Sequence, residues 1–79
     1  MPILLPDLGT VAATFSLWHV EPGERVKRGE RLAEVLIPGV AVELLAEASG
    51  VLIEVFAFPG DKLTADKTLG FIEAESNHD

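Results

Sequence analysis

The pentapeptide Pro22-Gly23-Glu24-Arg25-Val26 returns 37 residues later as Pro59-Gly60-Asp61-Lys62-Leu63, with matching residue character at all five positions. The same shift aligns further residue pairs of mostly apolar character: Thr14 with Val51, Trp18 with Val55, Val20 with Ala57, Leu32 with Leu69 and Val35 with Ile72. Two similar halves therefore cover most of the chain. Solenoids need about three repeats, so a pair of repeats predicts a closed molecule with an internal quasi-twofold axis.

Each half has the residue pattern of a strand, a turn and a second strand. Residues 14–20 are rich in β-branched and aromatic side chains, and a polar stretch, 24–31, separates them from the apolar residues 32–35. Residues 51–58 repeat this plan. Glycine and proline interrupt nearly every potential amphipathic helix of ~10 residues. The pattern predicts an all-β fold, either an antiparallel sandwich or a flattened barrel.

Length, composition and charge restrict the class of protein. A chain of 79 residues forms one small domain, residues 1–79, too small for a large catalytic cleft, and 48% hydrophobic residues are too many for a disordered chain. The formal net charge of −7 opposes binding to nucleic acid and to anionic membranes. No cysteine is present, and no uncharged stretch reaches the ~18 residues of a membrane span. We expect a soluble cytoplasmic chain with a disordered tail over residues 74–79.

An ordered series of short motifs runs along the chain. They are Leu5-Pro6-Asp7-Leu8-Gly9, Trp18-x-Val20, Pro22-Gly23-Glu24-x-Val26, Gly29-Glu30-x-Leu32-Ala33-Glu34-Val35, Ser49-Gly50-Val51 and Pro59-Gly60-Asp61-x-Leu63. Over residues 2–73 this series resembles the lipoyl domains of 2-oxo acid dehydrogenase complexes and, more distantly, biotin-carrier domains. The first motif and Trp18 favour the lipoyl branch. The resemblance implies a barrel-sandwich hybrid of two four-stranded antiparallel sheets, with the quasi-twofold symmetry that the repeat predicts independently.

The resemblance also implies a carrier lysine at the tip of a β-hairpin, in a pattern like Glu-Thr-Asp-Lys-Ala. Anchoring the comparison on Ala33-Glu34-Val35 and Val42-Glu43 places Leu36-Ile37-Pro38-Gly39-Val40 on those five positions, with Gly39 on the lysine. No lysine lies between Lys27 and Lys62. Because lipoate and biotin are attached through an amide to a side-chain amine, we expect no cofactor on this hairpin tip.

Pro38-Gly39 is nevertheless a strong turn signal, because proline presets φ at the first central position of a type II turn and glycine accepts positive φ at the second. Pairing outward from the turn sets Ile37 opposite Val40, Leu36 opposite Ala41, Val35 opposite Val42 and Glu34 opposite Glu43. Both faces near the tip are then apolar. Leu36, Ile37, Val40 and Ala41 are expected to be covered by a protein partner or a second copy, to pack onto the barrel, or to line a ligand pocket.

The remaining candidate residues indicate no catalytic or metal site. No motif places a serine or aspartate with His19, which we expect to be an exposed strand residue, whereas Trp18 is expected to fill the core. His78 and Asp79 are too few to hold a metal ion. Four of the six basic residues lie within positions 25–31, either as a solvated turn or as a docking patch for an acidic neighbour.

These observations favour a non-catalytic interaction module with the shape of a lipoyl domain and without its carrier lysine. The expected partners are subunits of a 2-oxo acid dehydrogenase-type complex or a second copy of the chain. The alternative is a carrier domain for acyl groups, lipoyl rather than biotinyl, with the acceptor lysine displaced or replaced. A structural relic without a partner is the third hypothesis.

Overall fold

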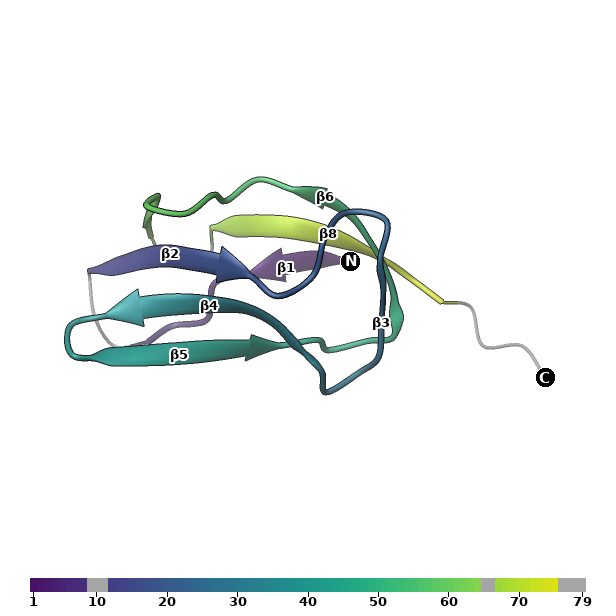
Figure 1. Ribbon diagram of the computed structural model, residues 1–79, viewed down its shortest axis with the longest axis horizontal. Helices are drawn as coiled ribbons and strands as arrows, with labels where there is room; N and C mark the ends of the chain where they lie inside the picture. The colour runs from purple at the N-terminus through teal and green to yellow at the C-terminus, as the bar shows by residue number, and fades with distance from the viewer. Residues whose placement is uncertain (9–11, 65–66, 76–79) are drawn as a thin grey trace.

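The computed structural model describes residues 1–8, 12–64 and 67–75, and these residues form eight β-strands (Figure 1). The strands are β1 (Pro2–Leu4), β2 (Ala13–Trp18), β3 (Arg25–Val26), β4 (Arg31–Ile37), β5 (Val40–Leu45), β6 (Gly50–Val55), β7 (Lys62–Leu63) and β8 (Thr68–Ala74). Within these ranges there is no helix long and apolar enough to cross a membrane.

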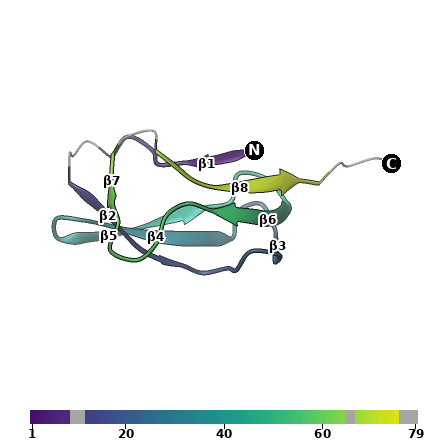
Figure 2. The same ribbon diagram turned by 90° about the horizontal axis from the view of Figure 1, so that it is seen from above.

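The strands form two four-stranded antiparallel sheets, ordered β1-β8-β6-β3 and β5-β4-β2-β7. In Figure 2, β1 and β8 of the first sheet lie above β4 and β5 of the second. The predicted fold class is therefore confirmed.

The 37-residue repeat is visible in the strands themselves. Shifting β2, β3 and β4 by this number of residues gives the bounds of β6, β7 and β8. Exchanging each strand for its equivalent under the shift converts the order β4-β2-β7 of one sheet into the order β8-β6-β3 of the other. The fourth strand is β5 in the first sheet and β1 in the second. The quasi-twofold relation predicted from the sequence is thus a property of the fold.

Two of the predicted strands differ from the observed ones. The strands were expected over residues 14–20 and 51–58. The observed strands β2 and β6 begin one residue earlier and end at Trp18 and Val55. The reason is topological, because residues 19–24 and 56–61 carry the chain from one sheet to the other and cannot continue the strand before them.

The core lies between the sheets and consists of apolar side chains from both. Its largest fully buried members are Phe15, Leu32, Leu52, Leu69, Ile72, Val26 and Val35. Trp18 packs against this core, as expected, with its ring centroid 5.1 Å from that of Phe15 and its indole N–H donating to the Ala57 carbonyl at 2.9 Å. The ring lies so near Gly70 of the other sheet that a Cβ there would be only 3.1 Å from it. Trp18 therefore joins the two sheets.

Two Pro-Gly turns carry the chain between the sheets. Gly23 and Gly60 have φ values of 96° and 93°, in the left-handed region that glycine adopts without a steric cost. In each turn a carboxylate accepts a hydrogen bond from the backbone amide three residues earlier, at 2.8 Å for Glu24 and 2.9 Å for Asp61. The repeated pentapeptide thus encodes a turn whose own side chain fixes its backbone.

These turns also connect the two halves of the repeat. The amide of Gly23 donates to the Leu52 carbonyl at 2.7 Å, and the amide of Gly60 donates to the Phe15 carbonyl at 2.9 Å. Phe15 and Leu52 are equivalent under the 37-residue shift, and both are fully buried. The turn of each half is therefore hydrogen-bonded to a core strand of the other half.

The predicted tail over residues 74–79 begins too early. Ala74 ends β8 and pairs with Gly50, and the amide of Glu75 donates to the Ser49 carbonyl at 2.9 Å. These two residues are ordered because β6 offers them backbone partners. Residues 76–79 lie outside the described part of the chain.

Gly50 tests how closely β6 and β8 are packed. A Cβ on this buried residue would overlap the carbonyl oxygen of Glu73 on β8, so we expect Gly50→Ala to lower the free energy of unfolding by about 1–3 kcal/mol. Urea denaturation followed by the fluorescence of Trp18, the single tryptophan, measures the loss. The control is Ile53→Ala on the same strand, where the side chain is 44% exposed and the expected loss is smaller. Equal losses in both variants would contradict the close packing.

Candidate functional site

The candidate site is the hairpin formed by β4 and β5. Its register is the predicted one, with Ile37 opposite Val40, Leu36 opposite Ala41, Val35 opposite Val42 and Glu34 opposite Glu43.

The turn at the tip is the predicted Pro38-Gly39. Gly39 has a φ of 79°, close to the value required at the second central position of a type II turn. Proline cannot adopt positive φ, so the mirror-image turns common in hairpins are not available to this sequence.

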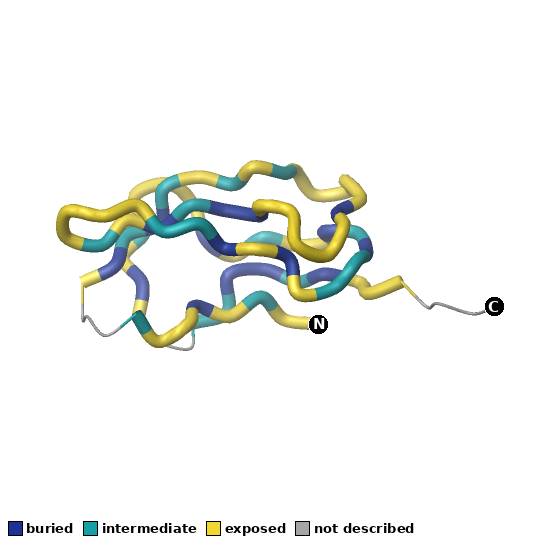
Figure 3. Tube along the Cα trace, turned by 90° about the horizontal axis from the view of Figure 1, so that it is seen from below, coloured by how far each residue is buried: buried dark blue, intermediate teal, exposed yellow. Residues whose placement is uncertain are grey.

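The apolar residues near the tip divide into an exposed and a partly buried group. Leu36 and Val40 are 42% and 54% exposed, and Ala41 is also exposed. Figure 3 shows the hairpin tip as an exposed stretch of chain at the left end of the molecule. Ile37 is half-buried and packs against the core, so of the four apolar residues it is the one that the barrel itself covers in part. The alternative that the whole tip is buried against the barrel is wrong for the other three residues. We call Leu36 and Ala41, which lie opposite each other on the outer face of the hairpin, the tip patch. Val40 lies opposite Ile37 and is exposed on the other face.

Gly39, which the resemblance places on the carrier lysine, has no side chain to which a cofactor could be joined. A Cβ at this position would meet no atom within 4 Å, so the space around the tip is open. An amide-linked lipoyl or biotinyl group needs an amine here, and the chain offers none on this hairpin. The family cofactor therefore does not fit the residues present at the tip.

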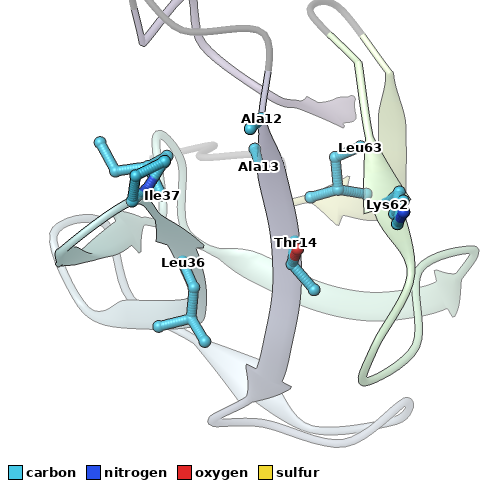
Figure 4. Close-up of a pocket in the computed structure, with 8 residues that line it drawn as sticks. Ala12, Ala13, Thr14, Leu36, Ile37, Lys62 and Leu63 are labelled. Carbon is cyan, nitrogen blue, oxygen red and sulfur yellow. The ribbon is translucent and has the colours of Figure 1, made fainter.

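A groove of about 570 Å³ lies between the hairpin and strands β2 and β7 (Figure 4). The residues that line it are Ala12, Ala13, Thr14, Leu36, Ile37, Pro38, Lys62 and Leu63. Ala13 and Leu63 are buried and form its floor, whereas Lys62 is exposed and supplies its one amine. Lys62 thus lies on the same groove as the tip, although it is far from it in the sequence.

Two glutamates face each other across the middle of the hairpin. Like charges directly opposite destabilise a strand pair unless other groups satisfy them. Here Ser16 Oγ donates to Glu34 Oε2 at 2.9 Å, and His19 Nε2 lies 2.7 Å from Glu43 Oε1. His19 is exposed, as predicted, but its contact with Glu43 was missed. The predicted register, which sets the two carboxylates opposite each other, was the available signal.

The polar side chains of Ser16, His19, Glu34 and Glu43 are not arranged as a catalytic site. Ser16 and His19 are hydrogen-bonded to different carboxylates, so the histidine does not contact the hydroxyl as a general base would. Within the described ranges, no group of three or more His, Cys, Asp or Glu side chains could hold a metal ion. His78 and Asp79 lie outside those ranges.

The basic residues of positions 25–31 do not join the hairpin tip. They lie on and after β3, which Figure 1 places at the other end of the molecule. Arg25 forms an exposed ion pair with Glu75 at 3.4 Å, and the side chains of the other three are exposed. An exposed pair of this kind contributes little to stability.

Three comparisons with known proteins agree with the fold. The family model for biotin- and lipoyl-type domains, described as "Biotin-requiring enzyme", matches residues 2–72. The chain is 44% identical over 62 residues to the dihydrolipoyllysine-residue succinyltransferase component of the 2-oxoglutarate dehydrogenase complex from Pseudomonas aeruginosa. It is 39% identical over 70 residues to the component of the same name from Escherichia coli.

These matches cover 78% and 86% of the chain but only 14% and 17% of the two relatives. The chain thus corresponds to a small part of each. Among solved structures, it is similar to the lipoyl domain of the 2-oxoglutarate dehydrogenase complex from Azotobacter vinelandii, with a TM-score of 0.78 and 33% identity over 95% of this chain and 99% of that one. A long-chain acyl-CoA carboxylase matches with a TM-score of 0.83 at 14% identity, covering 98% of this chain and 7% of the carboxylase, which shows likeness of fold alone.

The positive φ of Gly39 predicts a graded response to substitution. Gly39→Ala should lower the free energy of unfolding by about 1 kcal/mol, because a Cβ disfavours the left-handed conformation even where space is open. Gly39→Asn should lose less, since asparagine tolerates this conformation. Chemical denaturation measures both variants against the wild type. Unchanged stability in Gly39→Ala would contradict the turn assignment.

Proposed function

The chain belongs to the biotin- and lipoyl-domain family, and from this premise we propose that it is a non-catalytic lipoyl-type domain that acts by binding protein. In this proposal it carries no lysine-linked cofactor on its hairpin. The observation that supports it is the combination of an intact hairpin with glycine at the turn. The shape of a lipoyl domain is kept while the group that would accept the cofactor is missing.

The positions of the three lysines support the absence of a carrier function. Lys62 lies in β7 and pairs with Thr14 of β2, so its backbone is part of a sheet and not of an exposed turn. Lys27 follows β3, at the end of the molecule opposite the hairpin, and Lys67 precedes β8. None of them has the place of a residue at the tip of a two-residue hairpin loop.

The tip patch supports a role in binding. Leu36 and Ala41 lie opposite each other on paired strands, so both are exposed on the same face of the hairpin. Apolar side chains grouped at the surface are typical of protein contacts. Because the relatives are components of the 2-oxoglutarate dehydrogenase complex, we propose a subunit of a 2-oxo acid dehydrogenase-type complex as the partner.

The alternative function is an acyl carrier with a displaced acceptor lysine. Lys62 favours this alternative in one respect, since it lines the same groove as Ile37 and Pro38. An arm attached to Lys62 would start from the side of the hairpin and not from its tip.

Modification by a lipoate ligase separates the two functions. We expect the wild-type chain to keep its unmodified mass after co-expression with the ligase, because Gly39 has no amine. The lipoyl domain of the Azotobacter vinelandii complex serves as the positive control. A gain of one lipoyl group in the wild type, abolished by Lys62→Arg, would establish the alternative. Lipoylation of the Gly39→Lys variant would show that the ligase still recognises the hairpin.

Binding through the tip patch is tested with the purified 2-oxo acid dehydrogenase subunits of the source organism. Leu36→Glu places a charge on the exposed patch and should weaken capture of the partner subunit about tenfold. Ile53→Glu introduces the same charge at a residue of similar exposure on the other sheet and should leave capture unchanged. Capture that is equal for both variants and the wild type would rule out the patch as the docking site. Ile37 is unsuitable for this test because it packs against the core.

A further inference from the structure

The edge strands of the two sheets differ in how well they are protected against pairing with a strand of another molecule. The edge strands are β1, β3, β5 and β7. β3 and β7 have two residues each, and β1 has three and begins with Pro2, which lacks an amide hydrogen. β5 has six residues, of which Glu43 alone is charged. Among the strands that the structure describes, β5 is thus the one long edge without proline or lysine, the residues that commonly block edge-to-edge pairing.

The side chains of β5 are apolar where they are most exposed. Val40 and Leu45, at its two ends, are 54% and 52% exposed, and Ala41 is exposed as well. A strand of this kind presents unpaired backbone groups and apolar side chains to any other strand. We propose that β5 pairs antiparallel with β5 of a second copy of the chain, about a twofold axis through Val42.

The periodicity of a strand restricts how two copies can pair. Residues that lie opposite each other must point to the same face of the joined sheet, and side chains alternate between faces. A twofold axis perpendicular to the sheet must therefore pass through a residue and not between two residues. Ala41, Val42 and Glu43 are the central candidates.

The charge of Glu43 and the number of paired residues decide which of these three residues lies at the twofold axis. An axis through Glu43 would set the two Glu43 carboxylates directly opposite each other, which is unfavourable. An axis through Ala41 would pair fewer residues of β5. An axis through Val42 sets Ala41 opposite Glu43 and Val40 opposite Leu44, so no like charges face each other.

Contacts already present on the hairpin agree with this register. Glu43 is hydrogen-bonded to His19, so its carboxylate needs no cationic partner on the facing strand. Val40, which is 54% exposed, would lie opposite Leu44 of the second copy, and both residues are apolar. β5 is therefore complementary to itself, and this feature favours a second copy over an unrelated extended peptide.

The net charge gives this dimer a characteristic salt dependence. Two chains of formal charge −7 repel each other, and salt screens that repulsion. Pairing through backbone and apolar groups should therefore strengthen as salt is added. A cationic peptide docked on this acidic chain would show the opposite dependence.

This inference does not rest on the proposed function. Pairing at the edge of the sheet uses backbone groups and leaves the outer face, which carries Leu36, accessible to a partner subunit. A dimer that captures no dehydrogenase subunit would overturn the proposed function alone. A monomer that captures one would overturn the inference alone.

Sedimentation velocity of the isolated chain tests the dimer, at about 0.02 M and about 0.5 M NaCl. We expect a monomer–dimer equilibrium that shifts to the dimer with protein concentration and with salt. Val40→Lys should weaken the dimer at least about tenfold, because it places a lysine on the edge opposite Leu44. This variant reduces the net negative charge, so electrostatic repulsion cannot cause the loss.

The matched control is Ile53→Lys, which makes the same change of charge at an exposed β-branched residue of the other sheet. Its dimer should be as strong as that of the wild type or slightly stronger. A monomeric wild type at every concentration and salt, or an equal loss in both variants, would overturn the proposal.

Cysteine cross-linking tests the register, and the absence of native cysteine makes each introduced thiol unique. Ala41→Cys chains are mixed with Glu43→Cys chains under a thiol–disulfide buffer. These two positions lie directly opposite each other in the proposed dimer, at a spacing that a disulfide can bridge, whereas two Ala41→Cys chains are farther apart. We expect the mixed disulfide to exceed the Ala41→Cys homodimer. No such preference would overturn the pairing through β5.

Discussion

The reciprocal hydrogen bonds of the two Pro-Gly turns hold the fold together. Gly23 donates to the Leu52 carbonyl and Gly60 to the Phe15 carbonyl, so that each half supplies the acceptor that the other half needs. Buried backbone groups without a partner cost free energy, and neither half alone can satisfy both of these bonds. The left-handed glycines and the carboxylates of Glu24 and Asp61 fix the turns that bring these groups together. These crossings connect the two sheets that enclose the core.

The hairpin shows that its turn geometry does not depend on a side chain at the tip. Backbone pairing from Glu34 to Glu43 and the conformation of Pro38-Gly39 are sufficient to form it. A side chain at residue 39 would add no packing contact to the fold, since a Cβ there meets no neighbour. Replacing a lysine at such a position removes a reactive amine without disturbing the core. The hairpin can therefore form without an amine at residue 39.

Features that depend on local sequence were predicted well. The repeated pentapeptide predicted the symmetry of the sheets, and Pro38-Gly39 predicted the hairpin register, because turn type and alternation fix strand pairing locally. The burial of Ile37 beside the exposed Leu36 was not predictable, because it depends on which strands lie beneath the hairpin. The contact of His19 with Glu43 was missed for the same reason, since it joins residues that only the assembled sheet brings together.

The packing of Trp18 over Gly70 limits how far the two halves have remained alike. Under the 37-residue shift, Trp18 corresponds to Val55 and Gly70 corresponds to Ala33, so a large residue in one half faces the smallest residue in the other. A chain built from two identical copies of the first half would crowd the indole against a methyl group. One built from two copies of the second half would leave a void under a valine. Neither half can therefore take the place of the other without disturbing this contact between the sheets.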